Sequence, residues 1–309
     1  MGRVKFIPKE QKGWADLLDE FVMWKLVEGV SDQTASDYYS HVKLFMKRFP
    51  DSWDSEENLK LNLLEHLSQK MRPATFNNRL IYIRTFLSWC VENEYLKDNP
   101  ISKLKKRKDE GRIIDIELSS LKKLLEQPDT NTFAGLRDYA LILLTLDNGI
   151  RPKEAMSLIP KDFREKSLEI IIRPEVAKTR KIRRLPISEI TARAIKRLIS
   201  VRHDDWGNDV PIFCSYEGKH LTRHTWGDRL EVYSKRIGVH VTPYALRHCF
   251  ALEFIRNGAS AFHLQKALGH TTMAVTRRYV SLVDEDLRVQ HTKASPLNNL
   301  VPSVRKIKI

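Results

Sequence analysis

The sequence has little of what a membrane-bound or secreted protein needs. Its longest apolar run, YALILLTL (Tyr139–Leu146), is far too short to span a bilayer. The amino-terminal stretch MGRVKFIPKEQKG has no apolar segment that could serve as a secretory signal. The three cysteines, Cys90, Cys214 and Cys249, are widely separated and odd in number, which excludes a disulfide framework and a CxxC metal site. We therefore expect a cytoplasmic protein that does not contact a membrane.

Acidic residues are scarce relative to basic ones. The 309 residues include 53 lysines and arginines but only 39 aspartates and glutamates, which gives a net charge of +14. A positive excess of this size favours a polyanionic partner, most often a nucleic acid. On charge alone, a basic protein without such a partner is the alternative.

The hydrophobic pattern predicts two domains and a basic linker. Residues 1–100 contain four amphipathic helical patterns and no strand pattern, which predicts a small helical bundle. Residues 101–116 carry six basic residues between Lys103 and Arg112. They predict either a solvated linker or a strap that lies against a phosphate backbone. Residues 117–309 form the second domain, which we expect to end in a carboxy-terminal tail.

The second domain mixes helical patterns with a short β pattern. The stretches KSLEIIIRP (166–174) and KTRKIRRLPI (178–187), with a short linking piece around Glu175, predict a small antiparallel sheet with a basic turn. Helical patterns precede and follow this region. The predicted fold class is therefore mainly α with a small antiparallel β-sheet (α+β).

Three motifs in this domain concentrate groups that could act on an anion. In NGIRPKEAMSL, Arg151 lies between a glycine that ends one helix and Pro152, which starts the next, so its side chain leaves from a rigid corner. In TPYALRHCFALEF, Tyr244, Arg247 and His248 share one helical face. An ordinary surface arginine and a core or capping histidine are the alternatives for Arg151 and His248.

The third motif, LGHTTMAVTRRYVSL, places a tyrosine next to positive charge. Gly269 ends a helix, His270 lies in the turn, and the last turn of the following helix carries Arg277, Arg278 and Tyr279. Either the arginines are ordinary solvated cations, or an anion comes to the tyrosine.

Together these elements resemble the tyrosine recombinases, the phage integrase family. The Gly-x-Arg-x-x-Glu box of that family is matched by Gly149, Arg151 and Glu154. The Leu-Gly-His element is matched by residues 268–270, and the tyrosine nine residues after its histidine is Tyr279. The His-x-x-Arg-His box is matched at Arg247 and His248, but Tyr244 stands where the first histidine is expected. The lysine of the family's β-hairpin corresponds to Lys178.

The resemblance implies a specific chemistry. The oxygen of Tyr279 attacks a DNA phosphodiester, forms a 3′-phosphotyrosyl link and frees a 5′-hydroxyl, with no ATP, metal or other cofactor. Arg151 and Arg247 offer bidentate hydrogen bonds to the non-bridging oxygens, and Lys178 protonates the leaving oxygen. His270 contacts a non-bridging oxygen or positions the nucleophile, and Tyr244 replaces a histidine as a neutral hydrogen-bond donor. The implied partner is double-stranded DNA, with a homotetramer on two DNA sites. The resemblance also implies that residues 1–100 are the core-binding domain that holds the DNA and that residues 117–309 are the catalytic domain.

Several activities fit the same residues. We favour a mobile-element integrase without an arm-binding domain, because the Tyr244 departure is easier to reconcile with that diverse group. Xer-type resolution of chromosome or plasmid dimers is the alternative within the family. A type IB topoisomerase-like activity and a catalytically inactive DNA-binding protein are the alternatives outside it.

Overall fold

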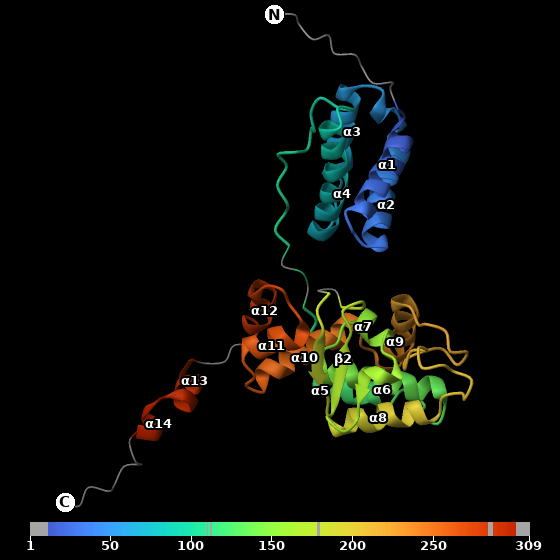
Figure 1. The fold of residues 1–309 in the computed structure, drawn as a ribbon. Helices are drawn as coiled ribbons and strands as arrows, with labels where there is room; N and C mark the ends of the chain where they lie inside the picture. The colour runs from blue at the N-terminus through green and yellow to red at the C-terminus, as the bar shows by residue number, and fades with distance from the viewer. Residues whose placement is uncertain (1–11, 110, 112, 178–179, 284–286, 301–309) are drawn as a thin grey trace, which may run out of the picture. The chain divides into compact units, whose positions relative to one another are not determined.

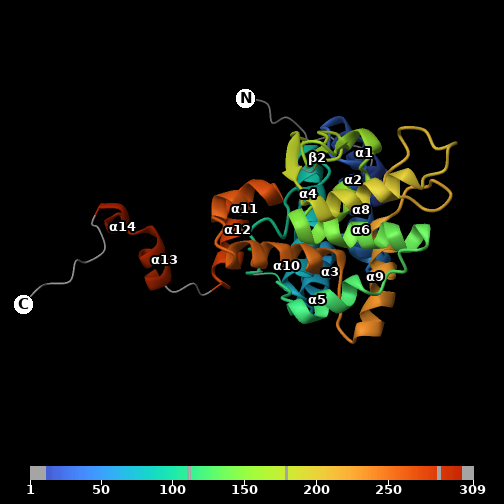
Figure 2. The ribbon, with the colours of Figure 1, turned by 90° about the horizontal axis from the view of Figure 1, so that it is seen from below.

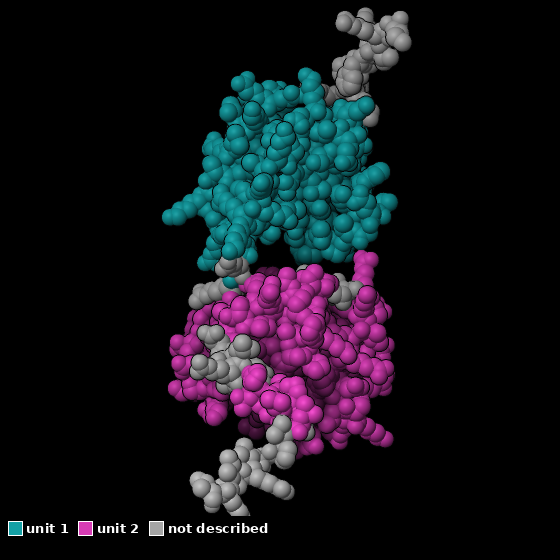
Figure 3. Space-filling view, turned by 90° about the vertical axis from the view of Figure 1, so that its left-hand side faces the viewer, with its two compact units in different colours: residues 1–112 teal, residues 113–309 magenta. Residues whose placement is uncertain are grey.

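The computed structural model describes residues 12–109, 111, 113–177, 180–283 and 287–300 (Figure 1). The chain divides into two compact units, residues 1–112 and 113–309, which Figure 3 colours separately. The division falls inside the segment 101–116. The elements are mostly helices with one small antiparallel sheet, which confirms the predicted fold class. Among the described residues, no helix has both the length and the apolar character that crossing a bilayer requires.

The first unit is a helical bundle. Its helices begin where the sequence offers capping residues, because the side chains of Ser31 and Ser55 accept hydrogen bonds from the backbone amides of Thr34 and Asn58. Leucines and aromatic residues, including Leu63 and Phe21, fill its core. The elements are α1 (Trp14–Val27), α2 (Asp32–Arg48), the 3₁₀ turn η1 (Pro50–Trp53), α3 (Glu56–Ser68) and α4 (Pro73–Glu92).

The first residues after this bundle pack against α4. Ile101 is fully buried in the core of the unit. The backbone amide of Arg107 donates to Asn77 Oδ1 at 2.8 Å, and its guanidinium lies 3.9 Å from the centre of the Phe76 ring. The start of the expected basic linker is therefore held on the helical unit through these contacts.

The second unit contains the rest of the described chain. Its helices are α5 (Leu118–Leu125), α6 (Phe133–Asn148), α7 (Pro152–Met156), α8 (Glu189–Ser200), α9 (Arg223–Ile237), α10 (Pro243–Arg256), α11 (Ala261–Leu268), α12 (Met273–Val280), α13 (Leu287–Ala294) and α14 (Leu297–Leu300). The 3₁₀ turn η2 spans Pro160–Asp162, and the strands are β1 (Phe163–Arg164), β2 (Glu169–Ile172) and β3 (Arg183–Pro186).

The sheet differs from the prediction in one strand. Its order is β1-β2-β3, all antiparallel, with Phe163 opposite Ile170 and Ile170 opposite Leu185. The piece around Glu175 is a turn, because the backbone amides of Val176 and Ala177 both donate to the carbonyl of residue 173. The preceding Pro174 also has no amide to offer a neighbouring strand. The outer strand comes instead from residues 163–164, which precede β2.

Helix α6 forms the centre of the second unit. Apolar residues surround most of it, so it is buried and packs against both α8 and α10 (Figures 1 and 2). It ends at Gly149, whose φ of 64° is the left-handed conformation that closes a helix. Because α6 is fixed on two sides, the turn that follows it is fixed as well.

Helices α10, α11 and α12 pack together beside this turn (Figure 2). Their contacts form a small separate core that includes Phe250, Leu264, Leu268 and the ring of Tyr279. Helix α11 ends at Gly269, which is also left-handed with φ of 61°. Two glycine turns, at Gly149 and Gly269, thus position the polar residues that follow them.

Candidate active site

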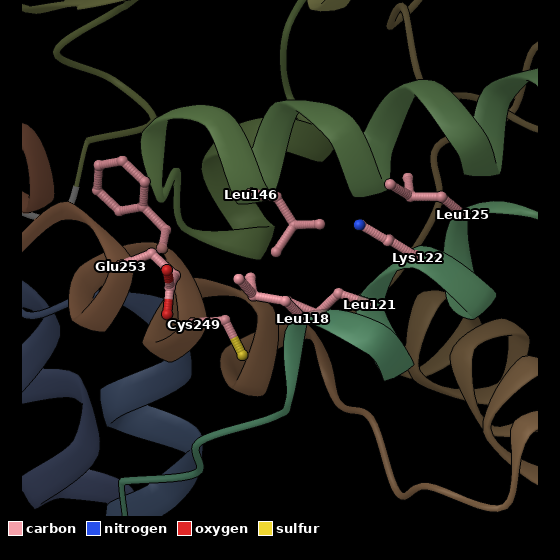
Figure 4. A pocket seen from close by; sticks show the side chains of 8 residues that line it. Leu118, Leu121, Lys122, Leu125, Leu146, Cys249 and Glu253 are labelled. Atoms are coloured by element: carbon pink, nitrogen blue, oxygen red, sulfur yellow. The ribbon is translucent and has the colours of Figure 1, made fainter. Parts of the chain in front are cut away.

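An apolar pocket lies between α5, α6 and α10, but its residues do not offer reactive chemistry (Figure 4). It is lined mainly by leucines, with Lys122, Cys249 and Glu253 among them. Burial raises the pKa of the Cys249 thiol to about 11, so this thiol is not a nucleophile near neutral pH. The reactive groups gather instead where the two glycine turns meet.

Two arginines hydrogen-bond to the backbone of the two glycine turns. Arg151 follows the Gly149 turn, and its Nη2 donates to the carbonyl of Gly269 at 2.8 Å. Arg247 on α10 donates through Nη1 to the carbonyl of Gly149 and through Nη2 to the carbonyl of Leu268, the latter at 2.8 Å. These contacts draw the ends of α6 and α11 together and fix both guanidinium groups.

A buried carboxylate lies beneath these arginines. Glu154 is 1% exposed and accepts from Arg151 Nη1 at 3.1 Å and from Arg183 Nη2 at 2.7 Å. Burial by itself would raise the pKa of Glu154, but the hydrogen bonds and charges of Arg183 and Arg151 outweigh it and lower that pKa below its usual value. Glu154 is therefore ionised and joins α7 to β3.

The cluster carries an excess of positive charge. Arg151, Arg183 and Arg247 contribute three positive charges and Glu154 one negative charge, which leaves two. Burial and the neighbouring Arg151 lower the pKa of Arg247 to about 10, so it is still a cation at neutral pH. An enclosed excess of about two charges suits an anion whose own negative charge grows during a reaction.

The two glycines are required by space as well as by conformation. A Cβ added to Gly269 would come 2.5 Å from Arg183 Nη1, and one added to Gly149 would come 2.8 Å from Leu268 Cδ2. Both residues also have a positive φ angle, which residues other than glycine rarely adopt. Replacement of Gly269 would press on Arg183, and replacement of Gly149 would press on the apolar side chains of Phe250 and Leu268.

Tyr279 points its hydroxyl at a histidine. Its ring is 5% exposed, and its Oη lies 2.8 Å from Nδ1 of His248 on α10. The ring of His270 lies nearly parallel to that of Tyr279, with an interplanar angle of 11° and a centroid distance of 6.3 Å. Burial raises the pKa of Tyr279, and the opposing charges of Arg247 and Arg278 do not reverse that shift. The tyrosine is therefore a neutral phenol at rest.

His270 connects the tyrosine to the arginine cluster. Its Nδ1 lies 2.9 Å from Thr276 Oγ1, and its Nε2 lies 3.4 Å from Arg247 Nη2. Burial, followed by the charges of Arg247 and Arg151, lowers the pKa of His270 to about 4. His270 is therefore neutral near pH 7 and serves as a hydrogen-bonding group.

The structure places four of the six expected site residues in this cluster: Arg151, Arg247, His270 and Tyr279. Tyr244, in the first turn of α10, is 45% exposed, and none of the described residues hydrogen-bonds to its hydroxyl. Lys178 lies outside the described residues, so its expected position stays a prediction.

The structure also adds three residues to the expected set. Glu154 and His248 were visible in the sequence motifs, but nothing in the motifs showed that they contact Arg183 and Tyr279. Arg183 is one of several basic residues in the β2–β3 segment, and only its contact with Glu154 distinguishes it.

Comparison with known proteins gives a family match and relatives that align along most of their length. The model of the phage integrase family matches residues 115–286, which is more than half of the chain. Tyrosine recombinase XerD of Lacticaseibacillus casei is 25% identical over 294 residues, which cover 91% of this chain and 98% of that protein. Tyrosine recombinase XerC of Myxococcus xanthus is 27% identical over 264 residues, which cover 78% and 86% of the two chains.

Solved structures share the fold. The Tn1549 transposon integrase in complex with transposon right end DNA has a TM-score of 0.70 and 17% identity, and the match covers 93% of this chain and 99% of that one. The XerH site-specific recombinase bound to palindromic difH substrate has a TM-score of 0.69 and 22% identity, and the match covers 91% and 84%.

Proposed function

Because the chain belongs to the phage integrase family, we propose that it is a site-specific recombinase that cuts and rejoins double-stranded DNA through a 3′-phosphotyrosyl link to Tyr279. The observation that carries this proposal is the packing of a buried tyrosine hydroxyl beside an arginine cluster with two excess positive charges. The anion that comes to Tyr279 is then the scissile phosphate.

Arg151 and Arg247 stabilise the transition state. Each guanidinium has five N–H donors, and the contacts with carbonyls and Glu154 use only some of them. The remaining donors can bind the non-bridging oxygens, and their charge counts most as the phosphorane becomes doubly anionic. No metal ion is needed for this stabilisation, because the arginines supply the positive charge.

Lys178 and Tyr244 complete the proposed reaction. Lys178 gives a proton to the leaving 5′-oxygen, and a second strand's 5′-hydroxyl later reverses the attack. The exposure of Tyr244 leaves its hydroxyl available to a bound phosphate, one helical turn before Arg247. It would act as a neutral hydrogen-bond donor.

The helical bundle of the first unit and the basic segment that follows the bundle bind the DNA flanking the cleavage site. The residues between Lys103 and Arg112 supply positive charge for phosphate contacts. Four protomers act on two DNA sites, and the tail after Val283 links neighbouring protomers. The reaction takes place in a reducing cytoplasm, in keeping with three buried free cysteines.

A mobile-element role is our proposal within the family, because Tyr244 replaces the histidine of the family pattern. Resolution of chromosome or plasmid dimers is the second candidate, and the similarity to XerD over 91% of the chain supports it. Recombination between a circular donor and an unlinked target would favour the first role. Resolution restricted to directly repeated sites on one molecule would favour the second.

Trapping on a suicide substrate tests the proposal. A nicked duplex that loses its short 5′-hydroxyl strand after cleavage should accumulate a covalent protein–DNA adduct. Tyr279→Phe should bind the same duplex but form no adduct. Tyr233→Phe is a matched control, because it removes another buried hydroxyl, one bonded to Asp138, and should leave adduct formation intact. An adduct formed by Tyr279→Phe would contradict the assignment, and relaxation of supercoils without strand exchange would indicate a topoisomerase.

A further inference from the structure

The hydroxyl of Tyr279 has one hydrogen-bond partner that the reaction described so far does not use. His248 Nδ1 lies 2.8 Å from Tyr279 Oη, and the two rings are 5.8 Å apart between centroids. His248 is on α10, directly after Arg247, and its side chain is partly exposed, whereas Tyr279 is buried. A basic nitrogen at hydrogen-bond distance from the nucleophile's oxygen has the geometry of a proton acceptor.

The other nearby histidine is already engaged at both nitrogens. Arg247 Nη2 can only donate, so the Nε2 of His270 that faces it accepts, and its Nδ1 then carries the hydrogen and donates to Thr276 Oγ1. In this tautomer His270 has no free lone pair for the phenol proton. His248 accepts at Nδ1 when its own hydrogen is on Nε2.

We infer that His248 is a catalytic residue that takes the proton of Tyr279 when the tyrosine attacks the phosphate. The Tyr279 O–H bond breaks and the proton moves to His248 Nδ1, while the tyrosine oxygen forms a bond to phosphorus. The bond between phosphorus and the 5′-oxygen breaks, and that oxygen takes a proton from the general acid. In the rejoining step the 5′-hydroxyl loses its proton to the same acid, and His248 returns its proton to the departing phenolate. This inference rests on the proposed function.

The charges around the pair support these protonation states. Burial first, and then the charges of Arg247 on α10 and Arg278 on α12, lower the pKa of His248, so the imidazole is neutral and can accept a proton at neutral pH. The raised pKa of Tyr279 means that the phenol does not ionise unaided. His270, in the turn between α11 and α12, also lies near this pair, and it is uncharged at neutral pH as well.

A second role for the same hydrogen bond makes the opposite prediction. If His248 only held the tyrosine in a buried resting position, its removal would leave cleavage unchanged or faster. The rate of adduct formation in single-turnover experiments on the suicide substrate separates the two roles. The informative variant is His248→Asn, because the amide can place a hydrogen-bonding atom near the position of Nδ1 but cannot take up a proton. His248→Ala removes both properties.

We expect His248→Asn and His248→Ala to slow adduct formation by roughly 10²- to 10⁴-fold, the range typical of general base catalysis. In the parent protein the rate should fall as acid protonates His248 below its ordinary titration range around pH 6.5, and His248→Asn should lose that dependence. DNA affinity and thermal stability measured alongside show whether a variant is folded. A His248→Asn protein as fast as the parent, or one with the same acid limb, would overturn the inference. Failure of the parent protein to form any adduct would instead refute the proposed function.

Discussion

Glu154 on α7 and Arg183 on β3 form a buried ion pair, with Arg183 Nη2 donating to Glu154 Oε2 at 2.7 Å. The same carboxylate accepts from Arg151, so one acid orders two of the three arginines in the cluster. Through Glu154, the strand β3 is attached to the helix α7, which Arg151 directly precedes. The geometry of the anion site therefore depends on a residue that need not touch the anion.

Glu154→Gln should strongly destabilise the second unit. The substitution keeps hydrogen-bonding atoms but removes the negative charge that Glu154 brings to the cluster, so one buried and two partly buried cations face one another. Removal of one partner of a buried ion pair typically costs about 3–5 kcal/mol. Glu165→Gln is a matched control, because Glu165 pairs with Lys196 on the surface and should contribute less than about 1 kcal/mol. Urea denaturation of both variants measures their free energies of unfolding. Equal losses would show that the buried ion pair stabilises the protein no more than the surface pair does.

Lys178 should be required only when the leaving group needs a proton. Lys178→Ala should slow cleavage of an ordinary phosphodiester by roughly 10²- to 10⁴-fold. A 5′-bridging phosphorothiolate releases a thiolate without protonation, so the same variant should cleave it at nearly the parent rate. Cleavage rates on the two substrates measure this directly. An equal defect on both would assign the lysine a different role.

Tyr244→Phe should slow cleavage without weakening DNA binding. The change keeps the ring and deletes one exposed hydrogen-bond donor. A neutral hydrogen bond lost in the transition state is worth about 0.5–1.5 kcal/mol, so the rate should fall roughly three- to tenfold. Single-turnover cleavage and equilibrium binding on the same duplex give both quantities. An unchanged rate would show that Tyr244 does not contact the phosphate.

The tail should act between protomers. Leu297 and Leu300 on α14 are 61% and 72% exposed, and apolar side chains so exposed suit a contact with a second copy. Truncation after Val283 should leave binding to a single DNA site intact and impair the pairing of two sites. Replacement of both leucines by serine should have the same effect in a full-length chain. Gel-shift or mass-photometry experiments measure the pairing of the two DNA sites. Normal pairing by these proteins would show that the tail is not needed for assembly.

His66 should make the first unit sensitive to acid. It is fully buried beside Phe45 and Phe49, and neither ring nitrogen has a hydrogen-bond partner among the described residues. Burial, with the charges of Arg79 and Arg48, lowers its pKa from 6.5 to about 4. Protonation therefore favours the unfolded chain, so stability is full above about pH 6.5 and is lost as the pH falls toward 4.

The expected loss from this histidine is roughly 2–3 kcal/mol. Urea denaturation at about pH 7.5 and pH 5 should show this loss of unfolding free energy in the parent protein. The loss should be much smaller in His66→Leu. His41→Gln, on the neighbouring helix α2, is the control and should keep most of the acid sensitivity. The idea fails if His66→Leu retains the full pH dependence.

The sequence by itself determined the features that depend on neighbouring residues. Serine and threonine caps, the glycines that end α6 and α11, and the proline that starts α7 all lie within a few residues of the helix ends they define. The spacing from His270 to Tyr279 and the pattern at Arg151 are local in the same sense. These short-range patterns were sufficient to predict the fold class and the family. They also singled out Arg151, Arg247, His270 and Tyr279, which the structure brings together.

Only the tertiary structure decided which distant residues meet. His248 and Tyr279 are 31 positions apart, and Glu154 and Arg183 are 29 apart. The first contact depends on how α10 packs against α12, and the second on where β3 lies relative to α7. The helical pattern places His248 on the face of Arg247 but does not specify the element opposite it. Likewise, several arginines follow residue 178, and only the register of β3 opposite β2 brings Arg183 to the buried carboxylate. Partner choice is set by long-range packing because each helix or strand can satisfy its own local preferences with many different neighbours.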